Sequence, residues 1–186
     1  NNLFIDISII IPKFNEEENI ENLIIEIINN LNLEKKINFE IIVVNDFSTD
    51  RSSIILEEIS KKIKINIVNN GDNVGQSYSI LNGIKSSKFE TIVTLDGDGQ
   101  NDPKDILKLL EIYLSSNDIK LVGGLRTNRK DNVVKIFSSK IANYFRNLIL
   151  KDDCTDTGCG IKVFDKKIFL SFFHFNGIHR FLPALF

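Results

Sequence analysis

Methionine and tryptophan are absent from this chain of 186 residues, and cysteine occurs only twice. Cys154 and Cys159 are too few for a disulfide scaffold and their spacing does not match a zinc site, which favours a reduced, intracellular protein. The net charge of −2 provides no global basic field of the kind that attracts nucleic acid. No apolar run approaches the roughly 20 residues that a helix needs to cross a bilayer.

Two nucleotide-binding motifs are missing as well. The chain has no G-x-G-x-x-G turn, which disfavours NAD as a cofactor. It also has no G-x-x-x-x-G-K-[ST] loop, which excludes P-loop chemistry. Neither a dinucleotide-dependent oxidoreductase nor a P-loop enzyme is therefore expected.

Strand-like and helix-like segments alternate along the chain. The expected strands are short, apolar and rich in β-branched residues, and the expected helices carry apolar residues at helical spacing. Strands are predicted over residues 4–11, 39–45, 63–69, 90–95, 119–125 and 160–164, and helices over residues 15–31, 50–62, 75–87, 103–116 and 131–150. Repeated units of this kind predict a single α/β domain over residues 1–186, with a Rossmann-like, mostly parallel sheet flanked by helices on both faces.

The segment after the fourth expected strand carries two aspartates, Asp96 and Asp98. Ligands of such sheets bind beyond the carboxyl ends of the strands, and side chains two residues apart in extended chain leave on the same side. Gly97 and Gly99 allow the backbone a close approach to a ligand. Two carboxylates so placed suit a hard cation, and an open site of this kind suits Mg²⁺ or Mn²⁺ bridging a diphosphate.

An EF-hand calcium loop is the obvious alternative for this segment. That loop requires glycine at its sixth position and glutamate at its twelfth. Counted from Asp96, these positions hold Asn101 and Leu107. A strand is expected before the loop where an EF-hand has a helix, so the calcium loop is excluded.

Other acidic and amide side chains near the strand ends have structural interpretations. Asn15 is a good N-cap for the first helix, and the three glutamates that follow it suit the positive end of the helix dipole. Asp102 before Pro103 is typical of a helix start. The residues assigned a structural role on these grounds are Glu17, Glu18, Asp50, Asp102 and Asp105. No role is assigned to His174 or His179.

The last segment, residues 169–186, is rich in phenylalanine and ends on an apolar residue. One interpretation places it at a membrane interface, where aromatic side chains insert and arginine meets headgroup charge. The other places some of these side chains in the core. The apolar residues concerned are Phe169, Phe172, Phe173, Phe181 and Leu182. A domain seldom ends in this way, so the chain is expected to be cut short at this end.

The polar segments at the strand ends follow one another in a fixed order. They read IPKFNEEENI, VNDFSTD, DNVGQSYSILNGI, DGDGQNDP, GLRTNRKD and TDTGCGIKVF, and HRFLPALF comes last. Together they resemble the family 2 glycosyltransferases of the GT-A fold, and most closely the polyprenyl-phosphate sugar transferases similar to dolichol-phosphate mannose synthase. The resemblance covers nearly the whole chain. It implies that membrane segments follow the catalytic domain and are missing here.

The resemblance also implies a role for each matching residue. It assigns Mg²⁺ or Mn²⁺ to Asp96 and Asp98 with Gln100 as a third contact, and makes Asp98 and Asp156 catalytic. Asp156 would lie near the reacting carbon and orient or deprotonate the acceptor. The nucleotide sugar would be bound by Pro12, Asn15, Glu16, Asp46, Asn73, Gly75 and Asp96, with Asp46 reaching the base. The acceptor phosphate would be bound by Arg126, Arg129 and Arg180, because guanidinium groups match phosphate geometry. A solvated basic loop that includes Lys130 is the alternative for Arg126 and Arg129, and a turn residue is the alternative for Asp156.

Two positions depart from the family pattern. Asn45 stands where the family usually has an aspartate, and Lys13 and Phe14 replace a small residue followed by an aromatic one. The first departure weakens the case for an acidic requirement at position 45. The second weakens the case for a stacking contact directly after Pro12.

The function implied by the resemblance is inverting transfer of a sugar to a polyprenyl phosphate. The donor would be similar to GDP-mannose or UDP-glucose, and the site of action the cytoplasmic face of the inner membrane. The fragment itself is expected to be soluble or peripheral to the membrane, with no nucleic-acid partner, and self-association is left open. Two alternatives remain at this point: transfer to a glycan or protein, and an inactive module that binds nucleotide sugars.

Overall fold

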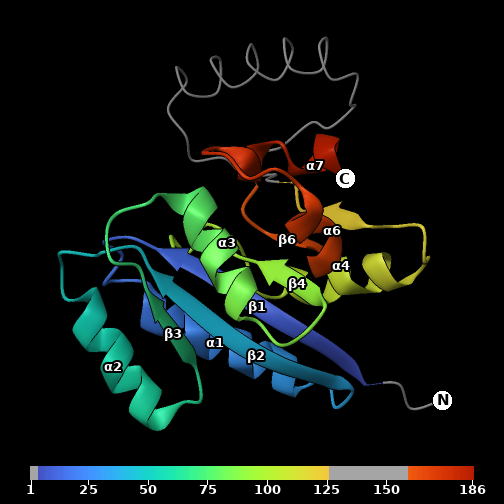
Figure 1. Ribbon diagram of the computed structural model, residues 1–186. Helices are drawn as coiled ribbons and strands as arrows, with labels where there is room; N and C mark the ends of the chain where they lie inside the picture. Colours follow the sequence, from blue (N-terminus) through green and yellow to red (C-terminus); the bar gives the residue numbers. More distant parts are fainter. Residues whose placement is uncertain (1–3, 126–158) are drawn as a thin grey trace, which may run out of the picture.

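The computed structural model describes residues 4–125 and 159–186, and these form a six-stranded sheet with helices on both faces (Figure 1). The strands, in sheet order, are β3 (Asn66–Asn69), β2 (Ile37–Asn45), β1 (Ile5–Lys13), β4 (Thr91–Thr94), β6 (Lys162–Asp165) and β5 (Leu121–Gly123). The helical segments are α1 (Ile20–Asn32), α2 (Ser52–Lys62), α3 (Gln76–Ser86), α4 (Asp105–Leu114), α6 (Lys166–Ser171), the 3₁₀ turn η1 (Ile178–Arg180) and α7 (Leu182–Leu185). The helix predicted over residues 131–150 lies outside the described residues.

The sheet is mostly parallel, as the alternation of strands and helices predicts. β1 pairs in parallel with β2 along its whole length and with β4 over four residues, and β2 pairs in parallel with β3. β6 runs antiparallel to both β4 and β5. The carboxyl ends of β1, β2, β3 and β4 therefore meet at one edge of the sheet, where the polar segments of the sequence begin.

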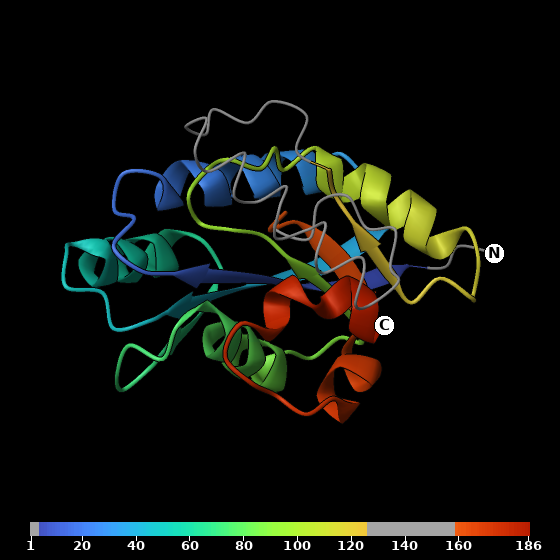
Figure 2. The same ribbon diagram turned by 90° about the horizontal axis from the view of Figure 1, so that it is seen from above.

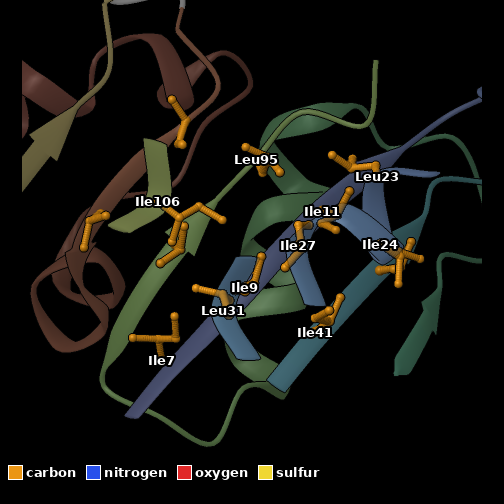
Figure 3. Packing of buried hydrophobic residues seen from close by; sticks show 14 of the residues in the cluster. Ile7, Ile9, Ile11, Leu23, Ile24, Ile27, Leu31, Ile41, Leu95 and Ile106 are labelled. Atoms are coloured by element: carbon orange, nitrogen blue, oxygen red, sulfur yellow. The ribbon is translucent and has the colours of Figure 1, made fainter. Parts of the chain in front are cut away.

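Helices lie on both faces of the sheet (Figure 2), and an apolar layer fills the space between sheet and helices on each face. On one face, the β1 side chains Ile7, Ile9 and Ile11 pack against α1 (Figure 3), and residues of α2 and α4 belong to the same layer. On the other face, Ile10 packs against α3 and the C-terminal segments. These four isoleucines are fully buried, which explains why β1 reads as an unbroken apolar run.

Pro12 lies inside β1 even though proline has no N–H group for the strand ladder. The Leu95 N–H donates to the carbonyl of Ile10, so the backbone N–H and C=O groups of even-numbered residues in β1 point toward β4. Pairing with β4 ends at Ile10, so Pro12 interrupts no hydrogen bond on that side. The strand runs to Lys13 for this reason, beyond the end at residue 11 that the sequence predicts.

Two expectations about the first helix are wrong. α1 begins at Ile20 and its N-cap is Asn19, so Asn15 lies four residues too early to be the N-cap, and only Glu21 is acidic in the first turn. Asn15 instead adopts a positive φ of 52° in the loop before the helix. The helical periodicity of the apolar residues is correct, but the three glutamates before Asn19 belong to a loop.

Asp50 and Asp102 are not the N-caps that the sequence predicts, since Arg51 precedes α2 and Lys104 precedes α4, but each aspartate accepts a hydrogen bond at the start of its helix. Asp50 accepts a hydrogen bond from the N–H of Ser52, the first residue of α2. Asp102 accepts one from the N–H of Lys104 in the turn that leads into α4. Pro103 lies in that turn, two residues ahead of the helix.

The phenylalanine-rich segment is divided between core and surface. Phe169 and Leu182 are buried in the apolar layer beside α3, so their assignment to a membrane interface is wrong. Phe172 is partly buried against the same layer, whereas Phe173 and Phe181 are exposed. In residues 4–125 and 159–186, no helix has the length and apolar character that crossing a membrane requires.

Gly83 sets how closely α3 approaches the sheet. A Cβ atom added at this position would lie 2.6 Å from Cγ2 of Ile10 and 2.8 Å from Cγ2 of Val44. Both methyl groups belong to β-branched side chains of the central strands, which have little rotational freedom. A side chain at position 83 would therefore push α3 away from β1 and β2.

We expect Gly83→Ala to lower the free energy of unfolding by about 1–3 kcal/mol, because overpacking outweighs the gain in helix propensity. Urea denaturation measures this change. Ser86→Ala, on the exposed side of the same helix, is the control and should alter stability by less than about 0.5 kcal/mol. A Gly83→Ala variant as stable as the wild type would contradict the close packing of α3.

Candidate active site

A cavity of about 240 Å³ lies at the carboxyl ends of β1, β2 and β4 and is bordered by the start of α3. Five of the residues predicted to bind donor or metal line it, and they come from three different strand ends. The lining residues are Pro12, Lys13, Phe14, Glu16, Asp46, Gln76, Ser79, Asp96, Gly97 and Asp98. The fold therefore brings together residues that are up to 86 positions apart, from Pro12 to Asp98.

Asp46, at the end of β2, organises the neighbouring loop. Asp46 is 4% exposed, and its carboxylate accepts hydrogen bonds from the N–H groups of Val74 (2.9 Å) and Gly75 (2.8 Å). It also accepts one from the side chain of Asn70 at 2.8 Å, and Asn70 in turn donates to Ser79. Asp46 thus fixes the connection between β3 and α3 at the wall of the cavity.

Asp96, at the end of β4, is held from two sides. Its Oδ1 accepts a hydrogen bond of 2.7 Å from the amide of Gln76 in the first turn of α3. The backbone of Gly160 lies against the same carboxylate, so closely that any side chain at position 160 would overlap it. Thr94 donates to the carbonyl of Gly160 at 2.9 Å and keeps that backbone in place.

The position of Asp98 differs from that of Asp96. Asp98 is exposed, and its Oδ1 accepts a hydrogen bond from the N–H of Gln100. The side chain of Gln100 is not among those that line the cavity and borders another depression with Asn101 and Asp102. The structure therefore brings Asp96 and Asp98 to the cavity but places Gln100 outside it.

Glu16 is the third carboxylate of the cavity. Its Oε2 atom is buried against Gly97 and has no hydrogen-bond partner among the described residues. Burial, followed by the negative charges of Asp98 and Asp96, raises the pKa of Glu16 to about 7, although the charge of Lys13 opposes the shift. Excess negative charge at this point is what a cation would relieve.

The residues of the cavity fit a cation for which the protein supplies only some of the ligands. In the described part of the chain, no group of three or more histidine, cysteine, aspartate or glutamate side chains is arranged to hold a metal ion. Asp96 and Asp98 can supply two carboxylates, so the remaining positions would come from ligand oxygens and water. Mg²⁺ in particular commonly uses one or two carboxylates together with substrate phosphates.

Asn15 joins the loops that follow β1 and β2. Its side-chain oxygen accepts a hydrogen bond from the N–H of Thr49 at 2.8 Å, and its N–H donates to the hydroxyl of Ser48 at 3.1 Å. Glu17 strengthens the junction, because its carboxylate accepts from the N–H of Arg51 at 2.8 Å. Asn15 therefore shapes the loop that carries Glu16. The sequence alone did not predict this role for Asn15.

The remaining predicted residues fall outside the cavity lining. Gly75 is the N-cap of α3, with a positive φ of 81°, and Asn73 is exposed in the loop before it. Arg180 is exposed on η1, next to His179, which shares a hydrogen bond of 2.7 Å with Ser77 in the first turn of α3. This contact places η1 beside the helix that borders the cavity. Asp156, Arg126 and Arg129 lie outside the described residues.

Gln76 and Gly160 are site residues that sequence reasoning missed. Gln76 stands in the segment DNVGQSYSILNGI, which contains the start of the third helix, and Gly160 stands in TDTGCGIKVF, but neither residue was singled out. Their role depends on contact with Asp96 across the sheet. No local pattern in the sequence indicates such a contact.

A mostly parallel sheet with the carboxylates Asp96 and Asp98 after β4, beside an acidic cavity, is the arrangement of a GT-A glycosyltransferase domain. The profile of glycosyl transferase family 2 matches residues 8–173, and the chain belongs to this family. The resemblance found in the sequence is thereby confirmed.

Two curated relatives are similar to this chain over most of its length. The chain is 31% identical over 183 residues to dodecaprenyl-phosphate galacturonate synthase of Rhizobium johnstonii, covering 97% of this chain and 54% of the relative. It is 31% identical over 184 residues to undecaprenyl-phosphate 4-deoxy-4-formamido-L-arabinose transferase of Pectobacterium carotovorum, covering 97% and 55%. The chain therefore spans about half the length of these relatives.

A solved structure supports the fold. Glucosyl-3-phosphoglycerate synthase from Mycobacterium tuberculosis, in complex with Mn²⁺, UDP and glucosyl-3-phosphoglycerate, superposes with a TM-score of 0.71 at 19% identity. The match covers 95% of this chain and 63% of the other. At this level of identity the similarity shows a shared fold.

The raised pKa of Glu16 makes a prediction for stability without metal. Between its ordinary value of 4.5 and about 7, folded Glu16 keeps a proton that the unfolded chain releases, so the free energy of unfolding falls as pH rises through this range. We expect Glu16→Gln, which does not titrate, to flatten this decline in EDTA and to be more stable than the wild type at pH 8. Denaturation at several pH values measures it.

Glu18→Gln, at an exposed position of the same loop, is the control. It should leave the pH dependence of the wild type unchanged. Equal pH slopes for wild type and Glu16→Gln would show that the carboxyl group is not perturbed by burial in the cavity.

Proposed function

We propose that this protein transfers a sugar from a nucleoside diphosphate sugar to a polyprenyl phosphate, with inversion at the reacting carbon. One observation carries the proposal: Glu16, Asp96 and Asp98 border one cavity of about 240 Å³ at the strand ends. A diphosphate could enter such an acidic cavity only together with a cation. The names of the curated relatives support the acceptor class, because both refer to a polyprenyl phosphate.

In this proposal Asp96 and Asp98 hold Mg²⁺ or Mn²⁺. The cation supplies charge stabilisation to the diphosphate as it leaves. Gln76 keeps the Asp96 carboxylate in place, and Gly160 leaves room for it. The amide and backbone contacts exist without any ligand, so the protein need not reorganise them during the reaction.

The donor nucleotide in this proposal extends from the two aspartates across the end of β1 toward Asp46. The wall on that side is rigid, because Asp46 and Asn70 connect β2, the loop before α3 and α3 itself. A donor similar to GDP-mannose or UDP-glucose fits the proposal. The solved structure with a similar fold contains UDP and Mn²⁺, which supports a nucleoside diphosphate in this family of folds.

The acceptor side of the proposal uses residues near the C-terminal segments. Arg180 lies on η1 beside α3 and would meet the acceptor phosphate together with Arg126 and Arg129. Asp156 would orient the acceptor close to the reacting carbon. Because the acceptor is a lipid, we propose that the protein works at a membrane surface, on its cytoplasmic face.

The first test uses Asp98→Asn. This change removes a proposed cation ligand from an exposed position and leaves the core volume unchanged, so stability should not change. We expect the rate of transfer to fall more than about a hundredfold, the size of effect seen when one electrostatic contact to the transition state is lost. The assay follows label from a panel of nucleotide sugars into lipid extracts containing polyprenyl phosphate. Asp105→Asn, outside the cavity, is the control and should transfer normally.

A thermal-shift measurement tests the cation independently of transfer. UDP or GDP should raise the melting temperature only when Mg²⁺ or Mn²⁺ is present. Normal transfer by Asp98→Asn, or equal stabilisation in EDTA, would contradict the cation assignment. Efficient labelling of a soluble glycan with none in polyprenyl phosphate would replace the proposed acceptor.

The second test concerns the arginines. We expect the double variant Arg126→Ala, Arg129→Ala to raise the KM for polyprenyl phosphate by roughly tenfold or more, as loss of charge-assisted hydrogen bonds predicts. Binding of the nucleotide sugar, measured by calorimetry, should stay near that of the wild type. An unchanged KM for the lipid would show that these two arginines do not bind the acceptor phosphate.

A further inference from the structure

Three consecutive residues at the start of α3 each contact a different part of the molecule. The N–H of Gly75 donates to Asp46 at the end of β2. The side chain of Gln76 donates to Asp96 after β4, and Ser77 contacts the turn before η1. The first turn of α3 therefore joins two strand ends of the cavity to the C-terminal segment.

Ser77 binds the C-terminal segment through its hydroxyl group. The residue is 2% exposed, so this hydroxyl depends on protein partners. Its oxygen accepts a hydrogen bond of 2.9 Å from the N–H of Gly177 and lies 2.7 Å from Nδ1 of His179. Among the described residues, Nδ1 is the only acceptor within hydrogen-bond distance of this hydroxyl. Ser77 therefore donates its proton to Nδ1 of His179.

The surroundings of His179 agree with this direction of the hydrogen bond. Burial, followed by the positive charges of Arg180 and Lys162, lowers the pKa of the imidazole to about 4, so the ring is neutral near pH 7. A neutral ring leaves one nitrogen unprotonated, and Nδ1 is that nitrogen when Ser77 donates to it. The link between η1 and α3 is therefore a hydrogen bond between two neutral side chains.

Gln76 depends on the position of this turn for its contact with Asp96. Its side chain is exposed and long, so water competes for the amide and a fixed orientation costs conformational entropy. The N-cap of α3 is Gly75, and no side-chain hydrogen bond caps the helix in the described structure. The hydroxyl of Ser77, one residue beyond Gln76, anchors the turn to the C-terminal segment.

We propose that the hydrogen bond between Ser77 and His179 positions a ligand of the cation. It holds the first turn of α3 at the place where the Gln76 amide orients Asp96 for metal binding. The inference rests on the proposed function, in which Asp96 and Asp98 bind Mg²⁺ or Mn²⁺. Groups that orient metal ligands in this way raise the affinity for the metal. His179 is thus a positioning residue that acts through Ser77 and Gln76, without contact to the cation.

The test measures the affinity of the 186-residue chain for Mn²⁺ in the presence of UDP or GDP, by calorimetry. We expect Gln76→Leu to bind Mn²⁺ roughly tenfold more weakly, as loss of a ligand-orienting group predicts. His179→Leu and Ser77→Ala should each weaken binding roughly three- to tenfold, as loss of one hydrogen bond predicts. His179→Asn should bind like the wild type, because its amide oxygen takes the place of Nδ1 as acceptor. Ser77→Ala, the smaller change, keeps the test decisive if His179→Leu does not fold.

A double-mutant cycle separates positioning from general support of the fold. In the Gln76→Leu background, His179→Leu should cause no further loss of Mn²⁺ affinity, because the contact through which it acts is already gone. Two matched controls should bind Mn²⁺ like the wild type. Ser86→Ala removes a hydroxyl at the other end of α3, which donates to the carbonyl of Asn82. His174→Leu removes an imidazole of the C-terminal segment whose nitrogens have no hydrogen-bond partner among the described residues.

Three results would overturn the inference. The first is an unchanged Mn²⁺ affinity of His179→Leu and Ser77→Ala. The second is an equal loss from His179→Leu with and without Gln76, which would make the two effects independent. The third is a loss that His179→Asn does not restore although this variant melts at the wild-type temperature. A wild type that binds neither Mn²⁺ nor a nucleoside diphosphate would instead overturn the proposed function, and the inference with it.

Discussion

The pairing of β1 with β2 on one side and β4 on the other is the constraint on which the whole site depends. β1 lies in the middle of the sheet, and its apolar side chains are fully buried on both faces, with Ile7, Ile9 and Ile11 in one layer and Ile10 in the other. It can therefore shift only if both apolar layers are disrupted. The loops that carry Glu16, Asp46 and Asp96 leave from β1 and its two neighbours, so this pairing fixes their spacing. The close approach of α3 at Gly83 extends the same rigidity to the wall of the cavity.

The price of this arrangement is negative charge concentrated at one edge of the sheet. Backbone N–H groups stabilise part of this charge, since Val74 and Gly75 donate to Asp46 and Arg51 donates to Glu17. Glu16 receives no such donor at Oε2, and its pKa is raised to about 7. Perturbed pKa values of this kind are common at functional sites, where a ligand can supply the missing partner. In the proposed function, a cation beside Asp96 and Asp98 would offset this negative charge.

The C-terminal segment is an integral part of the domain in the described structure. Phe169 and Leu182 fill the layer beside α3, and His179 reaches Ser77 in the first turn of that helix. Burial, followed by the charges of Arg180 and Lys162, lowers the pKa of His179 to about 4, so it is neutral in this contact. The exposed residues Phe173 and Phe181 remain available for a surface role. The chain spans about half the length of its curated relatives, so the surroundings of this surface in the whole protein are part of the proposal.

Much of this could be predicted from the sequence, because local patterns encode it. The period of apolar residues determined the helices and strands, and the D-x-D spacing after β4 determined which carboxylates reach the strand ends. The tertiary structure alone decided which residues meet across the sheet. The contacts of Gln76 with Asp96 and of Asn15 with Thr49 depend on strands distant in sequence. The sequence could not indicate that Asn15 lies in a loop or that Phe169 is buried, because a side chain's partners are set by strand order and packing.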